Sequence, residues 1–146
     1  MIRVLITCGA TWTPIDDVRV ISNISSGEMG HLIAEAFRKQ KAEVTVIEGP
    51  VTHALTDKKV KVIKYRFFDE LANVLKKELL KKYDIIIHAA AVSDFKVVGA
   101  SGKKIASDRN VTLRLRIIIT SNMGIPRLIF NFLNRMQGLR YDIQET

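Results

Sequence analysis

The chain has 146 residues, which favours one domain spanning residues 1–146. Hydrophobic residues make up 47% of it and charged residues 26%, as in globular proteins, and no apolar run approaches the roughly 20 residues of a membrane span, which excludes a membrane protein. The net charge of +8 favours anionic partners, but basic residues do not alternate with aromatic ones, so we expect no nucleic-acid partner.

The first predicted element is a buried strand, RVLITC, over residues 3–8. It begins at once, without the long apolar region of a signal peptide, so we expect a cytoplasmic protein with no membrane partner. Its last residue is the single cysteine, Cys8, which we interpret as a buried and inert thiol, with a reactive thiol as the alternative. One cysteine and three scattered histidines predict no metal site.

Strands and helices alternate along the next part of the chain. A long loop is predicted over residues 9–26, and the apolar spacing of Met29, Leu32, Ile33 and Phe37 predicts a helix over residues 27–40. Strands follow over residues 43–48 and 60–65, a helix over 68–82, and an apolar strand over 84–91 that we expect to be buried on both faces.

The last third of the chain has a weaker pattern. Residues 95–110 show no period and predict a functional loop, while the alternation of VTLRLRIII predicts a fifth strand over 111–119. A final helix is predicted over 126–136. The order of elements predicts an α/β, Rossmann-like fold: a mostly parallel sheet with helices on both faces.

Ligands of such sheets bind beyond the carboxyl ends of the strands, and the loop after the first strand carries NISSGEMG at residues 23–30. Its glycines and serines precede a helix whose free N–H groups attract anions, which suggests phosphate binding. A simple helix cap at Ser25 or Ser26 is the alternative, and the position after the first strand favours a ligand.

Two later stretches fall at the same end of the predicted sheet. AAAVSDF, residues 89–95, combines small residues with Asp94 and Phe95, and suits either a flat ligand or tight packing. SGKKIAS, residues 101–107, places Lys103 and Lys104 near glycines, which suggests a flap that closes on a charged substrate.

These three stretches together resemble the phosphopantothenate–cysteine ligase family of coenzyme A biosynthesis, also called phosphopantothenoylcysteine synthetase. The similarity covers about residues 1–116, and the tail over 117–146 does not match. It implies that the carboxylate of 4′-phosphopantothenate attacks the α-phosphate of CTP or ATP, with Mg²⁺ assisting. The amine of cysteine then displaces the nucleotide from the acyl-nucleotide. The resemblance also implies a homodimer.

The resemblance assigns roles to matching positions. Asn23 would handle the acyl-nucleotide intermediate, and Lys103 or Lys104 would supply the cation of the flap. The residues implied in nucleotide binding are Gly9, Ala10, Thr11, Ser25, Ser26, Gly27, Gly30, Ala89, Ala90, Ala91, Asp94 and Phe95.

Two other functions remain open at this point. A dinucleotide-dependent oxidoreductase would use Glu48, at the end of the second strand, to bind a ribose hydroxyl, although Glu48 lies far more than about 20 residues beyond Gly9 and the glycine spacing differs. A truncated homologue that binds a nucleotide without full activity is the other, because the tail does not match.

Overall fold

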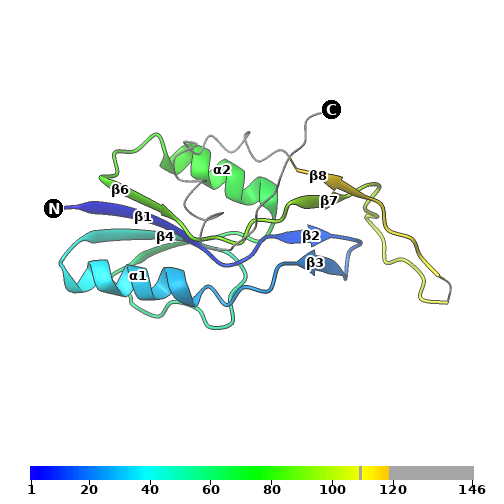
Figure 1. Cartoon of the computed structure of the whole chain (residues 1–146), viewed down its shortest axis with the longest axis horizontal. Helices are drawn as coiled ribbons and strands as arrows, with labels where there is room; N and C mark the ends of the chain where they lie inside the picture. Colours follow the sequence, from blue (N-terminus) through cyan, green and yellow to red (C-terminus); the bar gives the residue numbers. More distant parts are fainter. Residues whose placement is uncertain (109, 119–146) are drawn as a thin grey trace, which may run out of the picture.

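The computed structural model describes residues 1–108 and 110–118 (Figure 1). Its central sheet has four parallel strands in the order β5-β4-β1-β6, formed by β1 (Arg3–Cys8), β4 (Glu43–Glu48), β5 (Lys61–Lys64) and β6 (Ile85–His88). Helices α1 (Glu28–Lys39) and α2 (Phe68–Glu78) cover opposite faces of this sheet. The predicted Rossmann-like α/β fold is therefore confirmed. In the described ranges, no helix is long and apolar enough to cross a membrane.

The alternation of side chains along β1 explains why both faces of the sheet are covered. Val4, Ile6 and Cys8 pack with Ala34 of α1, whereas Leu5 packs with the buried residues of α2. Because successive side chains of a strand point to opposite faces, one apolar strand supplies two separate core clusters.

The predicted loop over residues 9–26 contains a short antiparallel hairpin, β2 (Trp12–Pro14) and β3 (Val20–Ser22). Asp16 closes its turn: Oδ1 accepts the N–H groups of Val18 and Arg19 at 3.0 and 2.8 Å. An aspartate that bonds to the backbone two residues later is a turn signal. The prediction of an irregular loop missed it because strands of three residues show no measurable period.

The prediction of a fifth strand in the parallel sheet is wrong. Only Leu115–Ile117 (β8) is a strand, and it pairs antiparallel with β7 (Phe95–Val97) in a separate ribbon. All three residues of β8 are exposed, so the alternation in the sequence does not mark a buried face.

Two further boundaries differ from the predictions. The three isoleucines of β6 are only partly buried, because β6 is an edge strand among the described residues, and the prediction of burial on both faces is wrong. The second helix ends at Glu78 rather than at residue 82. The predicted helix over 126–136 lies outside the described residues.

Candidate functional site

The loops that follow β1 and β6 meet at the carboxyl end of the sheet. Ala91 donates its N–H to the carbonyl of Gly9 at 2.8 Å, and Thr11 donates its N–H to the carbonyl of Ala91 at 3.3 Å. From β1 the chain first adds β4 and β5 on one side and then β6 on the other, so the strand order reverses between β1 and β6. The first two predicted motifs therefore meet at the switch point where open α/β sheets bind ligands.

Glycine is required at two positions of the first loop. Gly27, the N-cap of α1, has φ 78°, and a Cβ atom there would lie 2.3 Å from Val51 Cγ1. Gly9 has φ 80°, and its Cβ would lie 2.9 Å from the carbonyl oxygen of Pro50. The loop after β1 and the loop after β4 are thus in contact through atoms that no larger residue would allow.

Helix capping explains little of why Ser25 and Ser26 precede α1. Gly27 gives α1 no side-chain cap, and only Ser26 Oγ accepts an N–H, that of Glu28, at 3.3 Å. Since the N-terminal N–H groups of a helix lack partners within it, the start of α1 can donate to an anion.

A pocket of about 380 Å³ opens over this helix start. Four predicted site residues line it, namely Ala10, Asn23, Ser25 and Ser26. Thr11, Gly9, Gly27 and Gly30 are buried beside it. The remaining lining residues are Trp12, Ser22, Ile24, Pro50, Val51 and Thr52.

Asn23 joins the first two motifs. Its amide Nδ2 donates to the carbonyl oxygens of Ala91 at 3.3 Å and Val92 at 3.1 Å. Two carbonyl acceptors fix the NH₂ group on this side, which leaves Oδ1 without a partner among the described residues. The side chain is exposed and lines the pocket, so its oxygen can accept a hydrogen bond from a ligand.

The second motif has a structural part and an exposed part. Ala90 is buried in the core under α2, and Thr11 Oγ1 accepts the N–H of buried Ser93 at 2.7 Å. Ala89 and Ala91 are half-buried beside the junction with β1. Asp94 and Phe95 are exposed where the β7–β8 ribbon begins, and neither lines the pocket.

The flap, defined here as residues 99–107, is attached to the β2–β3 hairpin rather than to the pocket. Asp16 Oδ2 accepts the N–H of Ile105 at 2.9 Å, and the guanidinium of Arg19 donates to the carbonyl of Ile105. Asp16 and Arg19 also form an ion pair at 2.7 Å. Lys103 and Lys104 are exposed and do not line the pocket, so the structure does not bring them to Asn23.

Two buried titratable groups lie at the ends of β1 and β6. Cys8 is fully buried, as predicted, and burial raises the pKa of its thiol to about 11, which favours the predicted inert thiol over a reactive one. Burial lowers the pKa of His88 to about 4, and its Nδ1 is paired with the hydroxyl of Thr7. His88 is therefore a neutral imidazole in the core.

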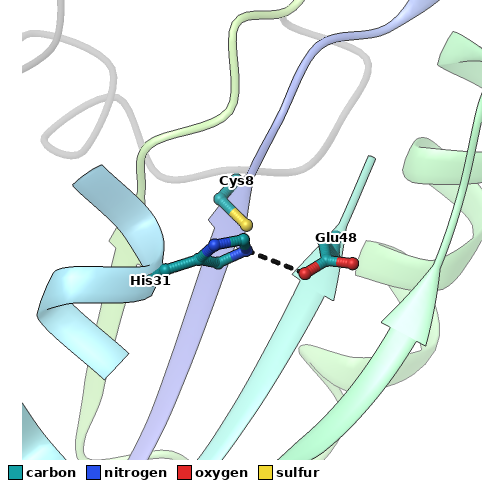
Figure 2. A group of neighbouring side chains, drawn as sticks. All are labelled: Cys8, His31 and Glu48. Carbon is teal, nitrogen blue, oxygen red and sulfur yellow. Dashed lines mark hydrogen bonds and ion pairs between the residues drawn. The ribbon is translucent and has the colours of Figure 1, made fainter. Parts of the chain in front are cut away.

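The fold also creates a cluster that the sequence did not indicate. Cys8, His31 and Glu48 point toward one another from β1, α1 and β4 (Figure 2). Glu48 is fully buried, and its carboxylate accepts from His31 Nε2 at 2.8 Å, from the N–H of Leu55 at 3.0 Å and from the ammonium of Lys64. Cys8, His31 and Glu48 are too far apart in the sequence to form a recognisable motif. An acidic residue at the end of an apolar strand, Glu48, was the one signal that this position is unusual.

Comparison with known proteins identifies relatives over most of the chain. The model of the DNA/pantothenate metabolism flavoprotein C-terminal domain matches residues 1–125. A cysteine/cysteine sulfinic acid decarboxylase from an unknown prokaryotic organism is 45% identical over 84% of this chain and 34% of its own. The coenzyme A biosynthesis bifunctional protein CoaBC of Thermococcus kodakarensis is 40% identical over 77% of this chain and 28% of its own.

A solved structure agrees with these relatives. The C-terminal domain of a coenzyme A biosynthesis bifunctional protein CoaBC has a TM-score of 0.66 and 26% identity, covering 93% of this chain and 59% of that one. This chain spans about a third or less of the length of the two curated relatives. The resemblance found in the three motifs is confirmed, and the chain belongs to the family of the C-terminal domain of DNA/pantothenate metabolism flavoproteins.

Proposed function

We propose that this domain ligates cysteine to 4′-phosphopantothenate in coenzyme A biosynthesis, through an acyl-nucleotide formed from CTP or ATP. The observation that carries the proposal is the position of Asn23 at the β1–β6 switch point. Its amide connects the loop before α1 to the second motif, AAAVSDF. Relatives named as coenzyme A biosynthesis proteins support the same assignment.

The pocket suits the phosphates of a nucleotide. The start of α1 supplies N–H donors, and Ser25 and Ser26 supply hydroxyls to the pocket lining. Gly27 packs against Val51 and so fixes the position of the helix start. The lining residues include no carboxylate, so Mg²⁺ would be held chiefly by the phosphate oxygens. Bound Mg²⁺ would offset charge that develops on those oxygens.

We propose that Asn23 contacts the acyl-nucleotide intermediate. With Nδ2 fixed on two carbonyls, Oδ1 is oriented to accept a hydrogen bond, for example from the incoming amine of cysteine. Lys103 or Lys104 would approach the phosphates only if the flap moves with a bound substrate, because both lie outside the pocket lining.

The alternative functions are less well supported. Glu48 is fully buried and already accepts three donors, so it has no free position for a ribose hydroxyl, which argues against the oxidoreductase. A nucleotide-binding homologue without turnover remains the second candidate.

The test is a two-step assay with Mg²⁺. We expect pyrophosphate release from CTP or ATP on addition of 4′-phosphopantothenate, and amide formation on addition of cysteine. Binding of the nucleotide without pyrophosphate release would favour the non-catalytic homologue, and absence of nucleotide binding by calorimetry would refute both.

Asn23→Asp separates the proposed role from a general loop function. The variant should impair product formation more than nucleotide affinity, because a carboxylate cannot donate to the carbonyls of Ala91 and Val92. Asn73→Asp is the matched control, since Asn73 is exposed on α2, outside this pocket. If Asn23→Asp lowers nucleotide affinity as much as product formation, Asn23 only shapes the loop.

We further propose a homodimer that works in the cytoplasm, where nucleoside triphosphates and cysteine are available. Large exposed apolar side chains on the β7–β8 ribbon, Phe95, Leu115 and Ile117, support a subunit interface there. Light scattering should give the mass of a dimer, and Ile117→Lys should shift it toward the monomer.

A further inference from the structure

The cluster of Cys8, His31 and Glu48 has the arrangement of three converging ligands. Cys8 and Glu48 are opposite each other in the register of β1 and β4, and His31 reaches them from the first turn of α1 (Figure 2). One sulfur, one nitrogen and one carboxylate oxygen all lie within 4.8 Å of one another, and His31 Nε2 is 2.8 Å from Glu48 Oε1.

The chemistry of these three atoms favours a zinc-like cation. Thiolate, imidazole and carboxylate are the ligands that Zn²⁺ takes in proteins, at about 2.0–2.3 Å, whereas Mg²⁺ and Ca²⁺ prefer oxygen alone. Bond lengths of that size separate ligand atoms by about 3–4 Å, so atoms that now lie up to 4.8 Å apart need to approach by about 1–2 Å. The His31–Glu48 pair, at 2.8 Å, needs to open slightly.

The three side chains are held in place by the core and largely closed off from solvent. Cys8 and Glu48 are fully buried, and the His31 side chain is 13% exposed. A carboxylate is costly to bury without a positive partner, and the ammonium of Lys64 supplies one here. The Lys64 side chain is itself 59% exposed, so its head group can leave for solvent without disturbing the core.

We propose that Cys8, His31 and Glu48 form a binding site for Zn²⁺ or a similar divalent cation, which replaces the ammonium of Lys64 on the Glu48 carboxylate. On binding, the Cys8 thiol gives its proton to solvent and the sulfur becomes a thiolate ligand. The His31 ring nitrogen that binds the cation carries no proton, so the neutral imidazole keeps its proton on the other nitrogen. Three protein ligands leave a fourth position for water, as in open zinc sites.

The position of the site gives the cation a structural consequence. Cys8 precedes Gly9, Glu48 precedes Gly49, and the N–H of His31 bonds to the carbonyl of Gly27 at 3.2 Å. A bound cation therefore joins the ends of β1 and β4 to the first turn of α1, directly beneath the loops that line the pocket. The cation site would form whether or not the domain is a ligase.

Co²⁺ titration of the full chain, first freed of metal with a chelator, tests the site. Co²⁺ takes the place of Zn²⁺ and reports its ligands by absorption. We expect one Co²⁺ per chain, a charge-transfer band from thiolate to cobalt, visible bands of a four-coordinate ion, and loss of both on addition of Zn²⁺. Absence of the thiolate band in the unmodified chain would overturn the proposal.

Variants of the ligands identify the residues. Cys8→Ser should abolish the thiolate band, and persistence of the band would contradict the assignment because Cys8 is the single cysteine. His31→Ala removes the nitrogen ligand at the partly exposed edge of the cluster and should weaken Co²⁺ binding by at least the roughly ten- to hundredfold that loss of a mere hydrogen-bond partner of a ligand costs. Circular dichroism of the metal-free variants checks that both are folded.

Lys64→Met gives a gain of binding that a misfolded variant would not show. It removes the competing ammonium and should tighten Co²⁺ binding by about tenfold, the equivalent of one charge-assisted hydrogen bond. Lys61→Met is the matched control, since Lys61 lies on the same strand and loses the same charge but pairs with Glu78. An equal effect in both variants would mean that general charge, and not exchange at Glu48, controls the affinity.

Discussion

Gly27 allows a quantitative test of how the pocket is built. Gly27→Ala forces an alanine to φ 78° and places its Cβ 2.3 Å from Val51 Cγ1. The left-handed backbone costs about 1–2 kcal/mol, and overpacking adds about 1–3 kcal/mol. We therefore expect the free energy of unfolding to fall by about 2–5 kcal/mol, a large part of the roughly 5–15 kcal/mol that stabilises a typical domain.

Val51→Ala separates the two costs. It removes the Cγ1 atom that the new methyl group would meet, and leaves the Val51 Cβ position at 3.1 Å. The double variant should therefore recover the overpacking part, about 1–3 kcal/mol, and keep the backbone part. Urea unfolding measures all four proteins of the cycle, and calorimetry with CTP or ATP measures whether the pocket still binds.

Gly102→Ala is the control for this cycle, because nothing lies within 4 Å of its Cβ position. It should change the free energy of unfolding by less than about 0.5 kcal/mol. If Gly27→Ala costs no more than Gly102→Ala, neither the left-handed backbone nor the contact with Val51 destabilises the variant. If the effects of Gly27→Ala and Val51→Ala simply add, the contact between the two loops is not the cause.

The buried polar groups His88, Asp16 and Tyr65 can each be tested by substitution. The pKa of His88 is about 4 in the folded chain against 6.5 when exposed, so the folded state is favoured by the neutral imidazole above about pH 6.5. This stabilisation, about 3 kcal/mol at most, is lost as the pH falls toward 4. Urea unfolding should show the free energy of unfolding falling over this pH range, and His88→Asn should reduce that dependence on pH. Asp16→Asn removes the charge that holds Arg19 and Ile105, so limited proteolysis should cleave the flap faster, whereas Asp17→Asn, at the exposed neighbour, should leave the cleavage rate unchanged. Tyr65→Phe deletes a buried hydroxyl that donates to the carbonyl of Cys8 at 3.0 Å and should cost about 1 kcal/mol in thermal unfolding, because that carbonyl keeps the N–H of Gly49; a cost above about 3 kcal/mol would contradict this account.

Two strands of the central sheet were the most predictable because they are six residues long and largely buried. The run over residues 3–8 and the run over 43–48 were predicted to the residue, since burial on both faces leaves only one reading of a β-branched segment. The β2–β3 hairpin and the β7–β8 ribbon were not, because strands of three residues are defined by turns and partners rather than by a period.

The candidate site divides in the same way. The glycines of the first loop could be singled out because their position after a strand is readable in the sequence, and the family resemblance pointed to Asn23. The attachment of Ile105 to Asp16 and Arg19, and the meeting of His31 with Glu48, depend on contacts between distant segments. Nothing in the local sequence specifies such pairs, so they appear only in the folded chain.

The attachment of the flap to the hairpin has a mechanical consequence. Ile105 is bonded through both its N–H and its carbonyl to the turn that joins β2 and β3, and β3 ends one residue before Asn23. The flap is therefore connected to Asn23 through the β2–β3 hairpin. A substrate that moves the flap would thereby also move the segment that carries Asn23, the residue proposed to contact the acyl-nucleotide, without any direct contact between the flap and Asn23.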